Sequence, residues 1–340
     1  MLKKREWIVF IFLILAILVL VIVNLFSGSS DVSINQMLDI LASHNTNDSL
    51  GVIVWQIRMP RMIESAFLGG ALALSGYLLQ SFFANPIAGP YVLGISSGAK
   101  LFVAILMVCS YKMMFNMSSL MMVAASFIGS CLAAMLVIVI SKKVKNMAIL
   151  IVCGVMIGYV CSAATELLVA FADDSNIVNL HNWSMGSFAA ASWKNVEIII
   201  PVVLIGLVMS VLLSKGTSVY LFGESYAMSV GMNIKRFRLF LILVSSLLSA
   251  IVTAYAGPIS FVGIAVPHVI RTVSKTSNVK AMICLSFLGG MATCLMCDLI
   301  ARCMFAPMEL SVSTITAVFG APVVVVMLLK KKNSHQRVDK

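Results

Sequence analysis

A chain of 340 residues in which 61% are hydrophobic and only 11% are charged cannot hide its apolar surface inside one soluble core. This composition excludes a soluble enzyme and indicates an integral membrane protein. The formal net charge of +11 does not indicate nucleic acid binding, because no basic run carries interleaved aromatic residues or the signature of a nucleic-acid-binding fold.

Ten apolar segments are predicted to form membrane helices. A hydrocarbon layer of about 30 Å requires roughly 20 apolar residues per helix. The predicted helices lie near residues 8–26, 62–83, 91–110, 116–140, 147–171, 196–213, 239–256, 261–274, 281–304 and 312–329. The eighth is short and contains Gly263 and Pro267, so we expect it to be broken or tilted. The predicted fold class is all-α, with a single membrane domain over residues 1–340 and a tail at about 330–340.

The first segment follows the basic residues 3–5 and so resembles the start of a signal peptide. Its apolar run, from Trp7 to Phe26, is longer than the usual signal-peptide core, and no cleavage-site pattern follows it. We therefore expect it to remain in the protein as a membrane anchor. The half-apolar loop over 27–57 is expected to form a lid at the membrane surface.

The stretch from Ile57 to Ala99 combines two arginines, a run of small residues and a loop. Arg58 and Arg61 stand three apart beside a proline, and a glycine- and alanine-rich apolar run follows them. The loop signal consists of Asn85, Pro86, Gly89 and Pro90, which lead into Gly94-Ile95-Ser96-Ser97-Gly98. Because apolar segments flank this loop, we expect it at one membrane surface and the arginines at the opposite surface.

The fifth segment carries a carboxylate where a charge is costly. Glu166 lies in its outer part, near Ser162 and Thr165. Such a residue is stable in a membrane only when it faces water or a partner, so we interpret it as facing a path or paired. The next loop, about 172–195, is too polar to span and too apolar to be free in water. It predicts a short amphipathic helix at the membrane interface, with Trp183 at headgroup depth.

The loop over 214–238 contains a short predicted helix. The segment from Gly223 to Asn233 has glycines at both sides of its helical part and is followed by a basic cluster at 235–238. One interpretation is an ordinary positively charged loop, and the other is a docking helix for another subunit.

Lysine and arginine are distributed unevenly between alternate loops. If the N-terminus is cytoplasmic, 18 of the 24 basic residues fall on the cytoplasmic side and Lys100 lies inside a segment. The five on the other side are Arg58, Arg61, Lys112, Lys194 and Arg302. The positive-inside rule therefore predicts that both termini are cytoplasmic.

No motif for catalysis, metal binding or nucleotide binding is present in the sequence. Cys294 and Cys297 have a metal-like spacing but lack a second pair or a nearby histidine, so we favour apolar packing over metal ligation. The chain has no Gly-x-x-x-x-Gly-Lys-Ser/Thr phosphate loop. We therefore expect no catalytic residue, no metal site and no cofactor, and the energy for uphill transport must come from another subunit.

Several ordered motifs resemble one family of bacterial transport proteins. They are the stretch over 57–99, Cys153-Gly154-Val155, Trp183 with Gly186, the run from Ala256 to Gly263, Val266-Pro267-His268, Asp298-Leu-Ile-Ala-Arg302 and the run from Thr316 to Pro322. In order and spacing they are similar to FecCD-family permease subunits of bacterial ABC importers for iron–siderophores, haem and cobalamin. The resemblance covers roughly residues 50–330, with departures at Lys100, Ser311 and Ser313.

The resemblance implies a type II ABC importer permease of about ten helices in the bacterial cytoplasmic membrane. It implies a homodimer with the translocation path at the subunit interface. Two copies of a cytoplasmic ATPase would bind the glycine-bounded helix, and a substrate-binding protein would deliver the solute to the outer face. Membrane lipid is the remaining expected partner.

The resemblance also implies that Arg58, Arg61 and Arg302 grip acidic residues of the binding protein. The alternative is that arginines at membrane ends reach toward water and need no function. Asp298 lies one helical turn before Arg302, and Glu64 lies three residues after Arg61, so we also expect a local ion pair at each position.

Two further groups of residues receive roles from the resemblance. The residues implied for ATPase coupling are Gly223, Glu224, Met228 and Gly231. The residues implied for the cytoplasmic gate and the path are Asn146, Met147, Ala148, Ser162, Thr165 and Glu166.

Two other functional classes stay open from the sequence. An ion-coupled secondary transporter would need a relay of intramembrane ionisable residues, for which Glu64, Glu166, Asp298 and Lys100 are available. A pore-forming or structural membrane protein would show no dependence on ATP. For the importer, a ferric siderophore is the predicted substrate because that role is the commonest in the family, and haem and cobalamin are the alternatives.

Overall fold

The computed structural model describes residues 3–28, 33–43, 48–113, 118–141, 143–144, 146–172, 174–306 and 308–336. These residues form helices joined by loops and contain no β-strand. The ten apolar helices are α1 (Lys4–Phe26), α4 (Met59–Phe83), α5 (Ile95–Met113), α6 (Ser119–Ser141), α7 (Met147–Val169), α9 (Trp193–Tyr220), α11 (Ile234–Ala256), α12 (Val262–Ser274), α13 (Val279–Cys303) and α14 (Val312–Gln336). The short helices are α2 (Ile34–Ser43), α3 (Ser49–Val52), η1 (Ile53–Arg58), η2 (Pro90–Leu93), α8 (Asp174–Ser184) and α10 (Glu224–Ser229).

Each predicted apolar segment overlaps one of the ten apolar helices, so the all-α prediction is confirmed. Within the described ranges, seven helices are long and apolar enough to cross a membrane, with α3, η1 and α4 counted as one helix over Ser49–Phe83. Shorter apolar stretches of α5, α12 and α14 supply the other three. The two largest shifts are at the ends of α9, which reaches Tyr220 instead of 213, and of α14, which reaches Gln336 instead of 329. In α9 the polar end residues Ser214 and Thr217 are buried against the protein.

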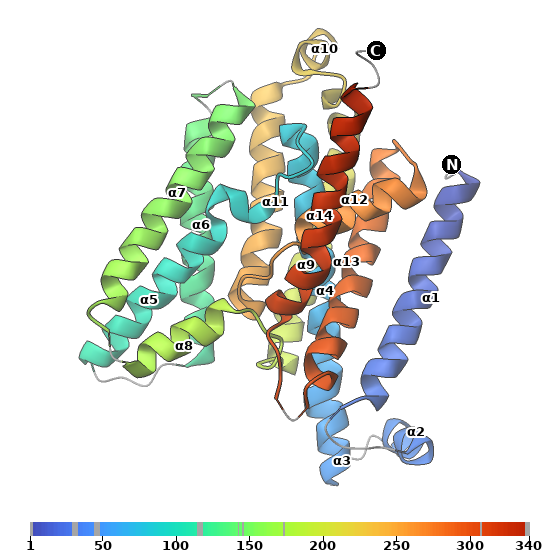
Figure 1. The fold of residues 1–340 in the computed structure, drawn as a ribbon, viewed down its shortest axis with the longest axis vertical. Helices are drawn as coiled ribbons and strands as arrows, with labels where there is room; N and C mark the ends of the chain where they lie inside the picture. The colour runs from blue at the N-terminus through green and yellow to red at the C-terminus, as the bar shows by residue number, and fades with distance from the viewer. Residues whose placement is uncertain are drawn as a thin grey trace.

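The two ends of the helix bundle carry different elements. One end, called the upper end from here on, carries the start of α1, the short helix α10 and the last turns of α14 (Figure 1). The opposite end, called the lower end, carries α2, α3 and α8. The first and last described helices therefore have their outer termini at the same end as α10.

α4 lies at the centre of the bundle, and its small residues let neighbouring helices approach closely (Figure 1). A Cβ on Gly69 would lie 2.5 Å from the carbonyl oxygen of Gly290 in α13. A Cβ on Gly76 would lie 1.8 Å from the carbonyl oxygen of Gly263 in α12, so no side chain fits there. Lipid offers little hydrophobic drive for helix association, so close packing of this kind holds membrane helices together.

Buried hydroxyls join α4 to α11. Ser75 Oγ lies 2.9 Å from Ser245 Oγ and 2.7 Å from Ser249 Oγ, and all three residues are fully buried. Hydrogen bonds between helices satisfy these polar groups away from water and add a fixed contact to the central packing.

α5, α6 and α7 form a second group of helices beside α11 (Figure 1). A Cβ on Gly98 of α5 would lie 2.6 Å from the carbonyl oxygen of Gly129 in α6, which shows close backbone packing. α7 lies at the edge of this group. Its Met156, Tyr159 and Val160 are 49%, 66% and 70% exposed, so one apolar face of α7 has no partner within the described chain.

The loop over 84–94 corrects the prediction that it lies at a membrane surface. Its second half returns into the bundle, where Gly89 packs against Ile264 of α12 and Gly94 lies against Gly154 of α7. As a result α5 begins at 95 instead of 91. Contacts with helices distant in the sequence bury this part of the loop, and the loop signal alone does not contain them.

A second break, over 257–261, separates α11 from α12. The backbone N–H of Ile259 donates to the Tyr91 hydroxyl at 2.9 Å, and the Gln80 side chain donates to the Gly263 carbonyl at 3.2 Å. Backbone that leaves a helix inside a membrane is stable only when protein satisfies its polar groups. α12 therefore begins inside the bundle and is short, as predicted, but it runs from Val262 to Ser274 with Gly263 and Pro267 inside it, so the break expected within this segment does not occur.

Candidate functional site

Two of the arginines predicted for partner docking come together at the lower end. Arg61 donates to Asp298 of α13 at 3.0 Å and to Glu309 at 3.0 Å. Arg302, one turn after Asp298, forms an ion pair with it at 3.3 Å. Asp298 is 1% exposed, so one buried carboxylate balances two guanidinium groups. We call Arg61, Asp298, Arg302 and Glu309 the arginine network.

The end of α1 contacts the same region. Arg58 donates to the carbonyls of Leu25 and Phe26, and Arg302 donates to the Asn24 side chain at 2.6 Å. Carbonyls in the last turn of a helix lack helical partners, and Arg58 supplies donors for two of them. Arg58 is 4% exposed and Arg61 is 6% exposed. The arginines predicted for docking are therefore largely engaged within the chain.

Of the two predicted local ion pairs, Asp298 with Arg302 is confirmed, and Arg61 with Glu64 is wrong. Glu64 is 1% exposed and accepts the backbone N–H of Ser192 at 3.3 Å. The first N–H groups of a helix have no helical acceptor and favour a carboxylate, so the start of α9 binds Glu64. Arg61 pairs instead with the carboxylates of Asp298 and Glu309.

α10 is the glycine-bounded helix predicted for ATPase coupling. Gly223 and Gly231 have φ angles of +110° and +85°, which residues with a side chain rarely adopt. These two glycines let the chain turn sharply before and after the helix. Ala227 is fully buried, and Glu224 pairs with Arg238 of α11 at 2.6 Å. One ion pair and one buried side chain thus hold α10 on the bundle.

The rest of α10 and its flanks presents apolar side chains outward. Phe222, Tyr226, Met228 and Val230 are 78%, 52%, 54% and 60% exposed, and we call these four residues the α10 surface. A cluster of exposed apolar residues at the end of a membrane protein is typical of a protein contact. Met228 was a predicted coupling residue, and the aromatic residues beside it were missed.

The residues predicted for the gate lie at the start of α7. Asn146 caps the helix, since its side chain accepts the backbone N–H of Ala148 at 2.9 Å. Asn146 and Ala148 are exposed, whereas Met147 packs partly against the core. The cap fixes where α7 begins at the upper end.

The three predicted path residues of α7 have different surroundings. Ser162 Oγ faces Ser97 of α5 at 3.5 Å, and the Thr165 hydroxyl donates to the carbonyl of Cys161 in its own helix. Glu166 is exposed next to the unpartnered apolar face of α7. Glu166 is therefore the one of the three that is free to face a second subunit or a solute.

Sequence reasoning missed Glu309 and Asn24 in the arginine region. Asn24 is the sole polar residue of the first predicted segment, which is a signal that the sequence does contain. Glu309 lies in an ordinary loop, and no local pattern connects it to Arg61. In the described ranges, no group of three or more histidine, cysteine, aspartate or glutamate residues is placed to hold a metal ion.

Comparison with known proteins covers nearly the whole fold. A family model, the FecCD transport family, matches residues 15–330. The hemin transport system permease protein HmuU of Yersinia pestis is 30% identical over 325 residues, which cover 95% of this chain and 97% of that protein. The vitamin B12 import system permease protein BtuC of Vibrio cholerae is 32% identical over 284 residues, which cover 83% of this chain and 84% of that protein.

A similar solved structure is also an ABC transporter. It is described as an inward-facing conformation of a metal-chelate type ABC transporter and superimposes with a TM-score of 0.83. The identity is 26%, and the match covers 95% of this chain and 99% of that chain. The arginine network and the α10 surface both lie within residues 15–330, which the family model matches.

Proposed function

The chain belongs to the FecCD transport family, and we propose that it carries a ferric siderophore across the cytoplasmic membrane. It is the permease subunit of an ABC importer and crosses the membrane several times, while a separate subunit hydrolyses ATP. As part of the proposal, residues 1–340 form one permease domain, the upper end is cytoplasmic and the lower end is external. The uneven distribution of basic residues supports this orientation.

The α10 surface is the observation that carries the energy-coupling part of the proposal. An importer permease without a phosphate loop needs an ATPase partner, and α10 offers an exposed apolar contact at the proposed cytoplasmic end. Gly223, Glu224, Met228 and Gly231 are assigned to this contact. Movement of the ATPase would reach α9 and α11 through the turns on either side of α10.

We place a second copy of the chain against α7. Its exposed apolar face would be covered there, and the path would run between the two α7 helices. Asn146, Met147 and Ala148 would narrow the path at the upper end, and Ser162, Thr165 and Glu166 would lie along it. Replacing Glu166 with Gln tests the one exposed carboxylate of this face. We expect altered uptake with unchanged ATPase binding, and unchanged uptake would contradict the assignment.

At the lower end, Arg58, Arg61 and Arg302 are assigned to docking of the substrate-binding protein. Because the arginines are partly engaged already, we expect partner carboxylates to add to the network or to replace Glu309. Charges at such contacts set encounter and register more than total affinity. Arg302→Gln should slow association of the binding protein with the permease–ATPase complex, whereas Lys194→Gln, an exposed control at the same end, should not.

The substrate is tested in proteoliposomes that contain the permease and its ATPase, with the binding protein added outside. We expect uptake of a radiolabelled ferric siderophore that requires ATP. Uptake of haem or cobalamin without any ferric siderophore would replace the proposed substrate and keep the mechanism. Uptake that persists without the ATPase and follows an ion gradient would contradict the importer function.

Haem is the second candidate substrate. The match covers 97% of the hemin transport permease HmuU, and this similarity supports haem as the alternative to a ferric siderophore. The same proteoliposomes separate the two candidates when haem and the ferric siderophore compete for uptake.

A further inference from the structure

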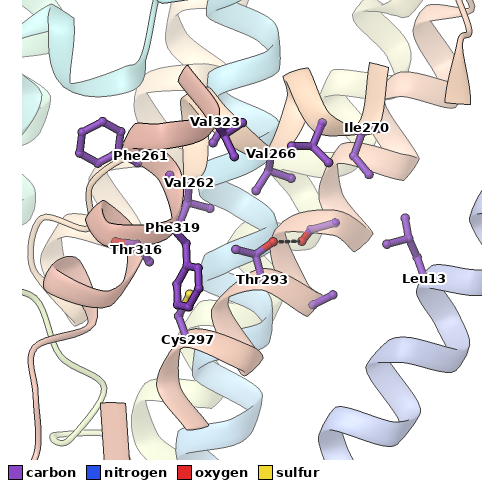
Figure 2. Close-up of a pocket in the computed structure, with 15 residues that line it drawn as sticks. Leu13, Phe261, Val262, Val266, Ile270, Thr293, Cys297, Thr316, Phe319 and Val323 are labelled. Atoms are coloured by element: carbon purple, nitrogen blue, oxygen red, sulfur yellow. Dashed lines mark hydrogen bonds between the residues drawn. The ribbon is translucent and has the colours of Figure 1, made fainter. Parts of the chain in front are cut away.

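An apolar cavity lies between α1, α12, α13 and α14 (Figure 2). Its volume is about 210 Å³, and Leu13, Val266 and Phe319 are among the residues that line it. The two threonines in the lining have their hydroxyls bonded within their own helices, since Thr293 donates to the Gly289 carbonyl and Thr316 to the Ser313 carbonyl. The cavity therefore presents almost only hydrocarbon.

A second cavity continues the first toward the upper end. Its volume is about 330 Å³, and α12 and α14 line it from His268 to Val273 and from Pro322 to Met327. The two cavities share Val269 and Val323 in their walls. Together they form one groove, called the α12–α14 groove, that runs from the middle of the bundle to its upper end.

The α12–α14 groove opens sideways, toward the surroundings of the spanning helices. Val269, Val273, Phe319 and Val326 along it are 41%, 48%, 49% and 50% exposed. Leu13 of α1 stands across from the α12, α13 and α14 side chains in Figure 2. If the bundle spans a membrane as proposed, this opening faces the hydrocarbon region, where acyl chains are the surrounding solvent.

Positive charge gathers where the groove reaches the upper end. Lys3, Lys4 and Arg5 are exposed at the start of α1. Arg5 also donates to the carbonyl of Val273, a residue of the groove wall, at 2.8 Å. The acidic neighbour of Arg5, Glu6, is buried and bonded to Thr276, so it is turned to the protein interior.

We propose that the α12–α14 groove binds one acyl chain of an anionic phospholipid, with the lipid phosphate beside Arg5 at the upper end. The apolar lining accommodates the chain, and the basic start of α1 complements the headgroup charge. The leaflet follows from the proposed orientation, so the inference rests on the proposed function in that respect. The groove borders α12, a short helix that begins inside the bundle, and the lipid would fill space that the protein leaves beside it.

Photolabelling tests the acyl chain. The full-length permease is reconstituted in phosphatidylcholine vesicles that contain phosphatidylglycerol with a photoreactive group on the acyl chain, and mass spectrometry locates the label. We expect label on α12 and α14 residues of the groove. Ala292→Phe, which fills the cavity, should abolish most of this label, and Ala124→Phe, an exposed position of α6, should leave it unchanged. If Ala292→Phe does not fold, Val269→Trp at the groove mouth replaces it.

The headgroup is tested by the preference for phosphatidylglycerol over phosphatidylcholine that carries the same photoreactive chain. One basic residue near a membrane surface changes the affinity for anionic lipid by about fivefold, so Arg5→Gln should lower the preference by about that factor. Arg236→Gln, an exposed arginine of α11 at the upper end, is the matched control. Equal labelling by both lipids would overturn the proposal.

Unchanged labelling in the groove-filling variant would also overturn it, as would a crosslink from the groove to a second copy of the chain in place of lipid. The assay requires no ATP, substrate or binding protein. Failure of the lipid site would therefore be distinguishable from failure of the importer function.

Discussion

The two ends of the bundle present their candidate contacts in opposite states. At the upper end, the α10 surface is exposed, and one ion pair and one buried alanine fasten the helix that carries it. At the lower end, Arg61 and Asp298 of the arginine network are buried and paired within the chain, with Arg61 shared between two carboxylates. One contact is available without any rearrangement, and the other is occupied by internal partners.

This difference matches the two kinds of partner that we propose. An ATPase that stays bound needs a permanent apolar contact, whose strength comes from a few well-buried anchors. A binding protein that delivers solute and leaves needs a contact that is exchangeable, and charged groups provide rapid and specific encounter. We therefore interpret the upper end as a lasting attachment and the lower end as a transient one.

The largest effect is expected from the buried carboxylate of the lower end. Asp298→Asn removes the partner of two guanidinium groups that are nearly excluded from water, and breaking a buried pair in this way costs about 3–5 kcal/mol. We expect a large loss of folded protein, measured as the thermal unfolding midpoint in detergent. Glu197→Gln, an exposed carboxylate of α9, is the control and should leave the midpoint unchanged. A stable Asp298→Asn protein would show that the network does not hold the lower end together.

The second effect tests whether the α10 surface is the lasting attachment. Replacing Tyr226 and Met228 with Lys removes two exposed apolar contacts without touching the Glu224–Arg238 ion pair, and interface anchors of this type contribute about 2 kcal/mol or more each. Co-purification of the ATPase should fall strongly, while the unfolding midpoint of the permease stays the same. Glu224→Lys with Met228→Lys should also uncouple ATP hydrolysis from uptake.

Lys235→Gln, an exposed residue beyond α10, serves as the control for that experiment. Full transport by the variant that combines Glu224→Lys with Met228→Lys, once it is stably inserted in the membrane, would refute the coupling assignment. Loss of binding in the control as well would indicate a general charge effect of the upper end.

The third effect concerns the turns around α10. Gly231 has a φ of +85°, and nothing lies within 4 Å of the position that a Cβ would take, so Gly231→Ala changes backbone preference alone. A residue with a Cβ pays about 1–2 kcal/mol in this conformation. We expect weaker ATPase binding, because α10 would populate its attached geometry less often. Gly158→Ala, inside α7 at an ordinary φ and with no atom nearer than 3.6 Å, is the matched control and should bind normally.

The sequence predicted the upper end better than the lower end, and the reason is physical. Ten apolar runs and a glycine-bounded helix are local patterns, and each was readable without knowledge of distant residues. The pairing of Arg61 with Glu309 joins positions 248 apart, and no periodicity encodes that choice. The Asp298–Arg302 pair was predictable because one helical turn separates the two residues.

The re-entrant loop over 84–94 illustrates the same limit. Proline and glycine correctly indicated that helix α4 ends there, but they could not show that the chain folds back between α7 and α12. That placement depends on glycines of other helices, such as Gly263, which permit close backbone contact. Sequence patterns thus identify which segments are helical, whereas the assignment of contacts between segments requires the structure.

The smallest effect is expected from Glu309, and it tests most directly whether the lower end is an exchangeable contact. Glu309 is the exposed member of the arginine network, since its side chain is 45% exposed while that of Asp298 is 1% exposed. A half-exposed ion pair contributes at most about 1 kcal/mol, so Glu309→Gln should leave the unfolding midpoint almost unchanged. If the lower end is an exchangeable contact, loss of this internal carboxylate frees Arg61 for the carboxylate of a partner. The binding protein should then associate with the permease–ATPase complex faster, by a factor that declines with added salt.

Glu197→Gln makes the same chemical change on an exposed face of α9 and should not alter the rate. Slower association in Glu309→Gln would instead mean that Glu309 takes part in docking. Arg61 would then stabilise the chain internally and would not contact the partner.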